Sequence, residues 1–137
     1  MRVYFDSSAL AKRYIEEAGT AEVLAWCERA SELALSAIAI PELISAFCRL
    51  QREGHLTRAQ YQAIKHALMT DIADALILET TPEVIQHAVK ALESHPLRGM
   101  DAIHLGAALV CAAEAFVSAD ARQCQAAKQL GLKVAAL

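Results

Sequence analysis

The chain has 137 residues, of which 55% are hydrophobic and 21% charged, and its formal net charge is −3 at pH 7. This length fits one domain, residues 1–137, with a core large enough to fold without disulfides. The charge argues against a strongly basic nucleic-acid binder, but it would change from −3 to +1 if four carboxylates were committed to cations.

The sequence also limits where the protein acts. No uncharged apolar run approaches the roughly 20 residues of a membrane span, and no secretory signal opens the chain. The four cysteines are scattered without CxxC spacing, which favours reduced thiols. We therefore expect a soluble, cytoplasmic protein without a membrane partner.

Taken in chain order, short apolar strands alternate with amphipathic helices. The strands are predicted at residues 3–5, 33–35, 76–78, 115–117 and 133–135, and the helices at residues 9–17, 21–30, 42–52, 58–73, 82–93, 100–113 and 121–130. Thr20 and Thr57 are predicted helix N-caps, and Gly131 is a predicted C-terminal stop. This order predicts an α/β fold with a parallel sheet covered by helices on both faces.

Two helices in the middle of the chain are predicted to form a hairpin. Apolar residues recur at helical spacing on both sides of the connection EGHLT. The first of these helices starts either at Ser36 or at Pro41, since proline is tolerated in a first helical turn. The start decides where Glu42 points.

Acidic residues recur where strands give way to helices. Asp6 follows the first strand and Asp120 follows the sequence FVSA, while Glu42 and Asp101 lie at the starts of helices. Each acid alone is explained by helix capping or by the helix dipole. Together they share one edge of a parallel sheet, where carboxylates without a cation would repel one another. The usual cation for oxygen ligands is Mg²⁺ or Mn²⁺, which suggests metal-assisted hydrolysis of a phosphate ester.

Four segments that contain these acids, FDSSAL, IPELISAF, RGMDAIHLGAA and FVSADARQCQAAKQLGL, carry a family resemblance. They resemble the acidic blocks of PIN-domain ribonucleases, most closely the toxin subunits of VapBC toxin-antitoxin pairs, and the resemblance covers essentially the whole chain. It implies a three-layer α/β/α fold with a five-stranded parallel sheet, and a metal-dependent endoribonuclease with an RNA substrate, a cognate antitoxin and a homodimeric state. It also implies that the metal-binding and catalytic quartet is Asp6, Glu42, Asp101 and Asp120, supported by the hydroxyls of Ser8 and Ser118.

Some neighbouring residues have two interpretations. Arg122 either contacts an RNA phosphate or is a solvated side chain, and His104 either supports the acids or is a hydrogen-bonded residue inside an apolar helix. Further basic residues are candidates for the rim of the cleft or are ordinary surface charges: Lys12, Arg13, Arg49, Arg52 and Arg98.

Other functions remain open at this stage. A PIN-like module that binds RNA or protein without catalysis is the main alternative, and retention of all four acids disfavours it. Haloacid-dehalogenase-type phosphotransfer enzymes need a second Asp where this chain has Ser8, and receiver domains need an acidic pair that is also missing here. Both phosphotransfer folds are therefore disfavoured.

Overall fold

The computed structural model describes residues 1–137 and contains a five-stranded parallel sheet with strand order β3-β2-β1-β4-β5. The strands are β1 (Arg2–Phe5), β2 (Glu32–Ser36), β3 (Leu76–Leu78), β4 (Ala115–Ser118) and β5 (Val134–Ala136). The helices are α1 (Ser7–Tyr14), α2 (Thr20–Arg29), α3 (Ala39–Arg52), α4 (Arg58–Asp74), α5 (Pro82–Ser94), α6 (Gly99–Val110) and α7 (Ala121–Gln129). The predicted α/β fold and five parallel strands are confirmed.

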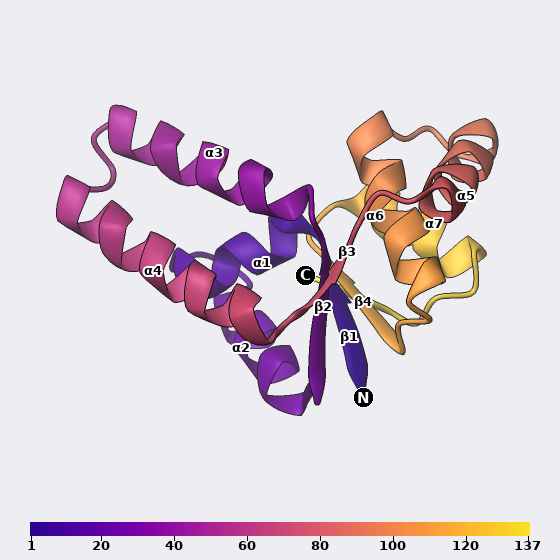
Figure 1. The fold of residues 1–137 in the computed structure, drawn as a ribbon, viewed down its shortest axis with the longest axis horizontal. Coiled ribbons are helices and arrows are strands. Elements are labelled where there is room, and N and C mark those ends of the chain that lie inside the picture. The colour runs from indigo at the N-terminus through magenta and orange to yellow at the C-terminus, as the bar shows by residue number, and fades with distance from the viewer.

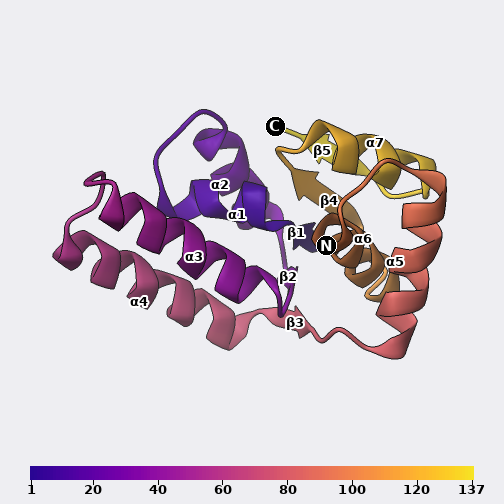
Figure 2. The same ribbon diagram turned by 90° about the horizontal axis from the view of Figure 1, so that it is seen from above.

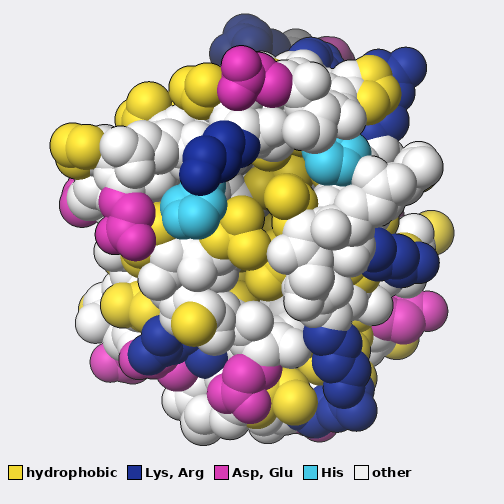
Figure 3. Space-filling view, turned by 90° about the vertical axis from the view of Figure 1, so that its right-hand side faces the viewer, with side chains coloured by type: hydrophobic (Ala, Val, Ile, Leu, Met, Phe, Trp, Pro, Cys, Tyr) yellow, Lys and Arg dark blue, Asp and Glu magenta, His cyan; other side chains and the backbone are white.

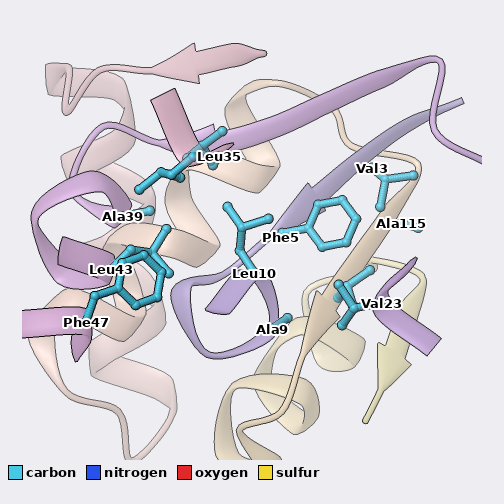
Figure 4. Packing of buried hydrophobic residues seen from close by; sticks show 12 residues of the cluster. Val3, Phe5, Ala9, Leu10, Val23, Leu35, Ala39, Leu43, Phe47 and Ala115 are labelled. Carbon is cyan, nitrogen blue, oxygen red and sulfur yellow. The ribbon is translucent and has the colours of Figure 1, made fainter. Parts of the chain in front are cut away.

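Two hydrophobic cores form on the two faces of the sheet because strand side chains alternate between them. Val3 and Phe5 of β1 pack among α1, α2, α3 and α4, whereas Tyr4 between them packs with the other core under α5, α6 and α7. Figure 1 shows these two helical layers on either side of the strands, and Figure 4 shows the first core, in which Phe5 and Leu10 lie between the sheet and the helices. The two helical layers therefore cover both faces of the sheet.

Helices α3 and α4 form an antiparallel hairpin that projects beyond the sheet (Figures 1 and 2). Phe47 of α3 and Leu68 of α4 are fully buried where the hairpin meets the first core. At the start of α4, Thr57 and Gln60 form a complete capping box, as predicted for Thr57. The predicted hairpin is confirmed. The first turn of α3 lies at the edge of the sheet, and its last turn lies at the far tip of the hairpin.

Several local predictions differ from the structure. Thr20 is not an N-cap: α2 is preceded by Gly19 at φ 96°, and the Thr20 hydroxyl instead donates to the carbonyl of Lys12. Helix α3 starts at Ala39, so that Pro41 is its third residue, where its missing N–H costs no intrahelical bond. Helix α6 ends at Val110, before Ala112, whose φ of 53° is incompatible with a helix.

The exposed apolar surface lies mainly along α5 and the start of α6. Within the hairpin only Met69 is an exposed large hydrophobic residue, because the other apolar side chains pack between α3, α4 and the core. Four such residues lie along α5 and the start of α6 instead: Ile85, Val89, Leu92 and Met100. Figure 3 views the molecule from the side of these helices and shows hydrophobic side chains reaching the surface between charged ones.

None of the helices combines the length and the apolar character needed to cross a bilayer. All four cysteines are free thiols, and two of them, Cys111 and Cys124, are buried.

Candidate functional site

Asp6 lies at the junction of β1 and α1, where it is the N-cap of the helix and only 1% exposed. Its carboxylate accepts hydrogen bonds from the Ala9 N–H at 2.9 Å, from the Ser8 hydroxyl at 2.8 Å, and from the Ser118 hydroxyl. Burial raises the pKa of Asp6, and these three donors only partly oppose the rise. A cation nearby would stabilise the ionised form of this buried carboxylate.

Ser8 and Ser118 connect the two acidic junctions of the sheet. The Ser8 hydroxyl also accepts from the Ala119 N–H at 3.1 Å, and the Ser118 hydroxyl accepts from the Asp120 N–H at 3.0 Å. Each serine therefore joins Asp6, which follows β1, to the chain that follows β4. The predicted supporting serines are in contact with the predicted acid.

Glu42 lies in the first turn of α3 and ends a buried chain of polar side chains. Its Oε1 accepts from the Ser7 hydroxyl at 2.6 Å and lies 2.8 Å from His104 Nε2, while His104 Nδ1 lies 2.8 Å from the Tyr4 hydroxyl. Burial raises the pKa of Glu42, but the bonds from His104 and Ser7 outweigh it, so that the net shift is downward. Glu42 is therefore held as a carboxylate.

The hydrogen-bond partners assign the tautomer of His104. A carboxylate only accepts hydrogen bonds, so Nε2 carries the proton that faces Glu42. Burial holds the pKa of Tyr4 well above its usual value, so its hydroxyl stays protonated. In the neutral imidazole, that hydroxyl donates a hydrogen bond to Nδ1. His104, which is 2% exposed, is thus both the hydrogen-bonded core histidine and a direct support of Glu42.

Asp101 and Asp120 lie at the starts of α6 and α7 and are joined by Gln123. Asp120 is the N-cap of α7, and its Oδ1 accepts from the Arg122 N–H at 2.9 Å and from the Gln123 N–H at 3.1 Å. Asp101 Oδ1 accepts from Gln123 Nε2 at 3.0 Å, and Arg98 Nε lies 3.7 Å from its Oδ2. Both acids thus share one partner in α7.

Gln123 is only 3% exposed, and its Oε1 is the one buried side-chain oxygen or nitrogen atom without a hydrogen-bond partner. Leaving such an acceptor unpaired costs about 1–3 kcal/mol. Exchanging the amide oxygen and nitrogen would not help, because an oxygen would then face the Asp101 carboxylate.

Two grooves meet at these acids. The first, the apolar groove, has a volume of about 610 Å³ and is lined by Glu42, Ile85, Ala88, Val89, Leu92, Arg98, Gly99, Met100, Asp101 and Ile103. The second, the polar groove, has a volume of about 490 Å³ and is lined by Pro96, Arg98, Asp101, Asp120, Ala121 and Arg122. Asp101 and Arg98 belong to both, so the grooves connect Glu42 with Asp120 through Asp101. Asp6 is buried and lines neither groove.

The donor chemistry of this edge fits a hard divalent cation. No three acidic, histidine or cysteine side chains are gathered into a metal-binding cluster in this arrangement. Mg²⁺, however, keeps several of its waters and commonly uses only one or two protein carboxylates. Glu42 with Asp101, and Asp101 with Asp120, each line a common groove and are the candidate pairs for such ligands.

The predicted basic residues lie in different places. Arg98 and Arg122 line the polar groove beside the acids. Lys12 and Arg49 line a third groove with Glu42, Ser7 and Ser8, where Lys12 contacts Glu17 at 3.0 Å. Arg13 lies elsewhere, and its guanidinium contacts Asp71 at 2.8 Å.

Sequence reasoning missed Ser7, Tyr4 and Gln123. Ser7 directly follows Asp6 and is paired with Ser8, and this serine pair was the one local signal that a second hydroxyl contacts the acids. Tyr4 and Gln123 occupy ordinary strand and helix positions, and no local pattern sets them apart.

Comparison with known proteins identifies the family. The sequence model of the PIN domain family matches residues 3–129 of the chain. The chain belongs to the PIN-domain family. Among its relatives, Ribonuclease VapC45 of Mycobacterium tuberculosis (strain CDC 1551 / Oshkosh) is 32% identical over 135 residues, which cover 97% of this chain and 94% of the relative.

Solved structures share the same PIN fold. FitAcB from Neisseria gonorrhoeae has a TM-score of 0.71 at 15% identity, covering 96% of this chain and 95% of that one. VapBC2 from Rickettsia felis, bound to a DNA fragment from their promoter, has a TM-score of 0.70 at 12% identity, covering 100% of this chain and 99% of that one. At these identities the likeness concerns the fold alone, and it agrees with the predicted three-layer PIN architecture.

Proposed function

We propose that this PIN domain is a divalent-metal-dependent endoribonuclease that hydrolyses RNA phosphodiester bonds and is the toxin of a type II toxin-antitoxin system. The observation that carries the proposal is the pair of joined grooves lined by Glu42, Asp101 and Asp120, together with the buried Asp6 at the end of β1. The full-length similarity to a relative named as a VapC ribonuclease supports the substrate class.

Asp101, with Glu42 and Asp120 on either side of it, would hold Mg²⁺ or Mn²⁺, and the buried Asp6 would add negative charge. When bound, such a cation activates water and neutralises charge on a phosphodiester. Asp101 is the acid common to both grooves, and its side chain is 22% exposed, so that solvent and substrate reach it.

The residues of the chain itself then bind and orient the substrate. Arg98 and Arg122 present guanidinium groups in the polar groove, where they would contact the RNA backbone on either side of the scissile phosphate. His104 and Ser7 keep Glu42 ionised and restrict its rotation. Because guanidinium contacts to phosphate carry no base information, these residues position RNA rather than select its sequence.

The proposal includes two protein partners, a cognate antitoxin and a second copy of this chain. VapBC2 from Rickettsia felis is one of the solved complexes that share this fold. The four exposed apolar side chains along α5 and the start of α6, Ile85, Val89, Leu92 and Met100, are the surface that a second copy would bury in a homodimer. Because they line the apolar groove, RNA would then reach Asp101 through the polar groove.

The test compares wild type with Asp101→Asn, which removes one charge at nearly constant shape. Its Oδ1 still accepts from Gln123, so the variant should melt at an equal or higher temperature than wild type in EDTA while losing RNA cleavage. Added Mg²⁺ should raise the melting temperature of wild type more than that of the variant. Asp74→Asn, an exposed acid at the end of α4, is the matched control and should behave as wild type.

Two outcomes would contradict the proposal. Cleavage by wild type that survives full chelation would reject the metal, and a fully active Asp101→Asn would reject the acidic site. A folded wild-type protein that binds RNA but never cleaves it would favour the alternative, a PIN-like binding module without catalysis.

A further inference from the structure

One buried side chain in α7 contacts two of the candidate metal-binding acids at once. The Gln123 backbone N–H donates to Asp120 at 3.1 Å, and its side-chain Nε2 donates to Asp101 at 3.0 Å. The first bond is an ordinary N-cap contact, which any residue at this position would make. The second is made by the side chain alone, and it joins the start of α7 to the start of α6.

The other half of the same amide group has no partner. Gln123 Oε1 is buried and accepts no hydrogen bond, although buried polar atoms in native proteins are almost always paired. An amide is planar and compact, so this oxygen lies beside the Nε2 that contacts Asp101. The unpaired acceptor is therefore next to the carboxylate that both grooves share.

A purely structural role does not account for a glutamine at this position. The neighbouring buried residues on the inner side of α7, Cys124, Ala126 and Ala127, are small, and of their side chains only the Cys124 thiol makes a hydrogen bond, to the carbonyl of Ser118. An apolar side chain of the same length would fill the same space and leave no acceptor unpaired. The contact with Asp101 accounts for the amide nitrogen, but the amide oxygen has a use only if something outside the side chains present supplies a hydrogen-bond donor.

We propose that Gln123 is a positioning residue for the cation site: it holds Asp101 toward Asp120, and its free Oε1 accepts a hydrogen bond from a water that accompanies the bound cation. This inference rests on the proposed function, because it assumes that the acids bind Mg²⁺ or Mn²⁺. Water suits the position because it is small and a strong donor when a cation polarises it, and ordered waters commonly pair otherwise unsatisfied buried groups. Outer partners of this kind orient carboxylate ligands and change metal affinity by about 10–100-fold when removed.

The test measures cation binding without RNA. Gln123→Met keeps the length and removes both amide groups, and Gln125→Met, an exposed position of the same helix, is the matched control. Titration calorimetry with Mn²⁺ should show about tenfold or greater weakening for Gln123→Met and no change for the control. In cleavage assays kcat should fall while KM for RNA stays within about twofold, because substrate contacts are left in place.

The fold must be followed separately. In EDTA, Gln123→Met should melt at or above the wild-type temperature, because the substitution removes the unpaired amide oxygen as well as the amide nitrogen that contacts Asp101. If this variant does not fold, the wild-type protein supplies the second measurement: the side-chain amide resonance of Gln123 should shift on Mg²⁺ addition and saturate with the binding curve.

The outcomes separate the two claims. A folded Gln123→Met with wild-type Mn²⁺ affinity, or an amide resonance unmoved by Mg²⁺ that binds, overturns the role of Gln123 and leaves the proposed nuclease intact. A wild-type protein that binds no cation and cleaves no RNA overturns both.

Discussion

Replacing Gly106 with alanine should push α5 and α6 apart. A Cβ atom built on Gly106 would lie 2.5 Å from the carbonyl oxygen of Val84 and 3.3 Å from the amide nitrogen of Ala88. Both are backbone atoms of α5, which cannot rotate away as a side chain can, so the helices must separate by roughly 1 Å to restore normal contact. This strain is the perturbation to be measured.

The magnitude follows from two opposing effects. Overpacking of this kind costs about 1–3 kcal/mol, and the rigid backbone contact favours the upper part of that range. Alanine recovers about 1 kcal/mol of helix propensity relative to glycine. The net loss is about 1–2 kcal/mol, which for a chain of this size lowers the melting temperature by roughly 4–8 °C.

Thermal melts followed by circular dichroism in EDTA measure this loss, with Gly99→Ala as the control on the same helix. No heavy atom lies within 4 Å of a Cβ at Gly99, so this variant should melt at or above the wild-type temperature. If Gly106→Ala is as stable as wild type, the close contact between α5 and α6 is wrong, and so is the shape of the apolar groove between them.

Further expectations concern other parts of the molecule. Burial raises the pKa of Asp71, but hydrogen bonds from Arg13 and Tyr14 lower it by more, so the folded pKa lies below the unfolded value of about 3.9. The stabilisation from this carboxylate is therefore complete above the unfolded pKa and is lost as pH falls through the folded pKa. Asp71→Asn should therefore cost about 1 kcal/mol at pH 7 and much less at pH 2 in urea unfolding; equal losses at both pH values would contradict this. Tyr4→Phe removes the donor to His104 Nδ1, should cost about 1–3 kcal/mol and should slow RNA cleavage; melts and cleavage both at wild-type levels would refute the polar chain. Val89→Glu places a charge on a side chain that is 48% exposed on α5 and should convert a homodimer into a monomer in light scattering at tens of micromolar, whereas a monomeric wild type would count against the dimer.

The positions of the strands along the chain were predictable because each strand is a short apolar run between helical patterns with clear ends. The acids at the ends of β1 and β4 were predictable for a related reason, since Asp6 and Asp120 are also the N-caps of the helices that follow and so sit in a recognisable local pattern. Their assignment as metal ligands stays a prediction.

Contacts between residues distant in sequence were not predictable. His104 meets Tyr4 across 100 residues, and Gln123 meets Asp101 across 22. Neither hydrophobic periodicity nor a helix-cap pattern predicts such partners. The prediction of Thr20 as an N-cap was wrong for the same reason. Its sequence context is that of an N-cap, but its hydroxyl donates to the carbonyl of Lys12, eight residues earlier. Gly19 is the N-cap instead, with a left-handed backbone conformation.

The place of β1 at the centre of the sheet has a consequence for the timing of synthesis. Its neighbours are β2, made soon afterwards, and β4, which begins only at Ala115. Asp120 is synthesised 114 residues after Asp6, which takes roughly 6–23 s at about 5–20 residues per second. Until then β1 has an open edge and the acids have no common surface. Under the proposed function, the growing chain therefore has no complete acidic site until Asp120 has been made.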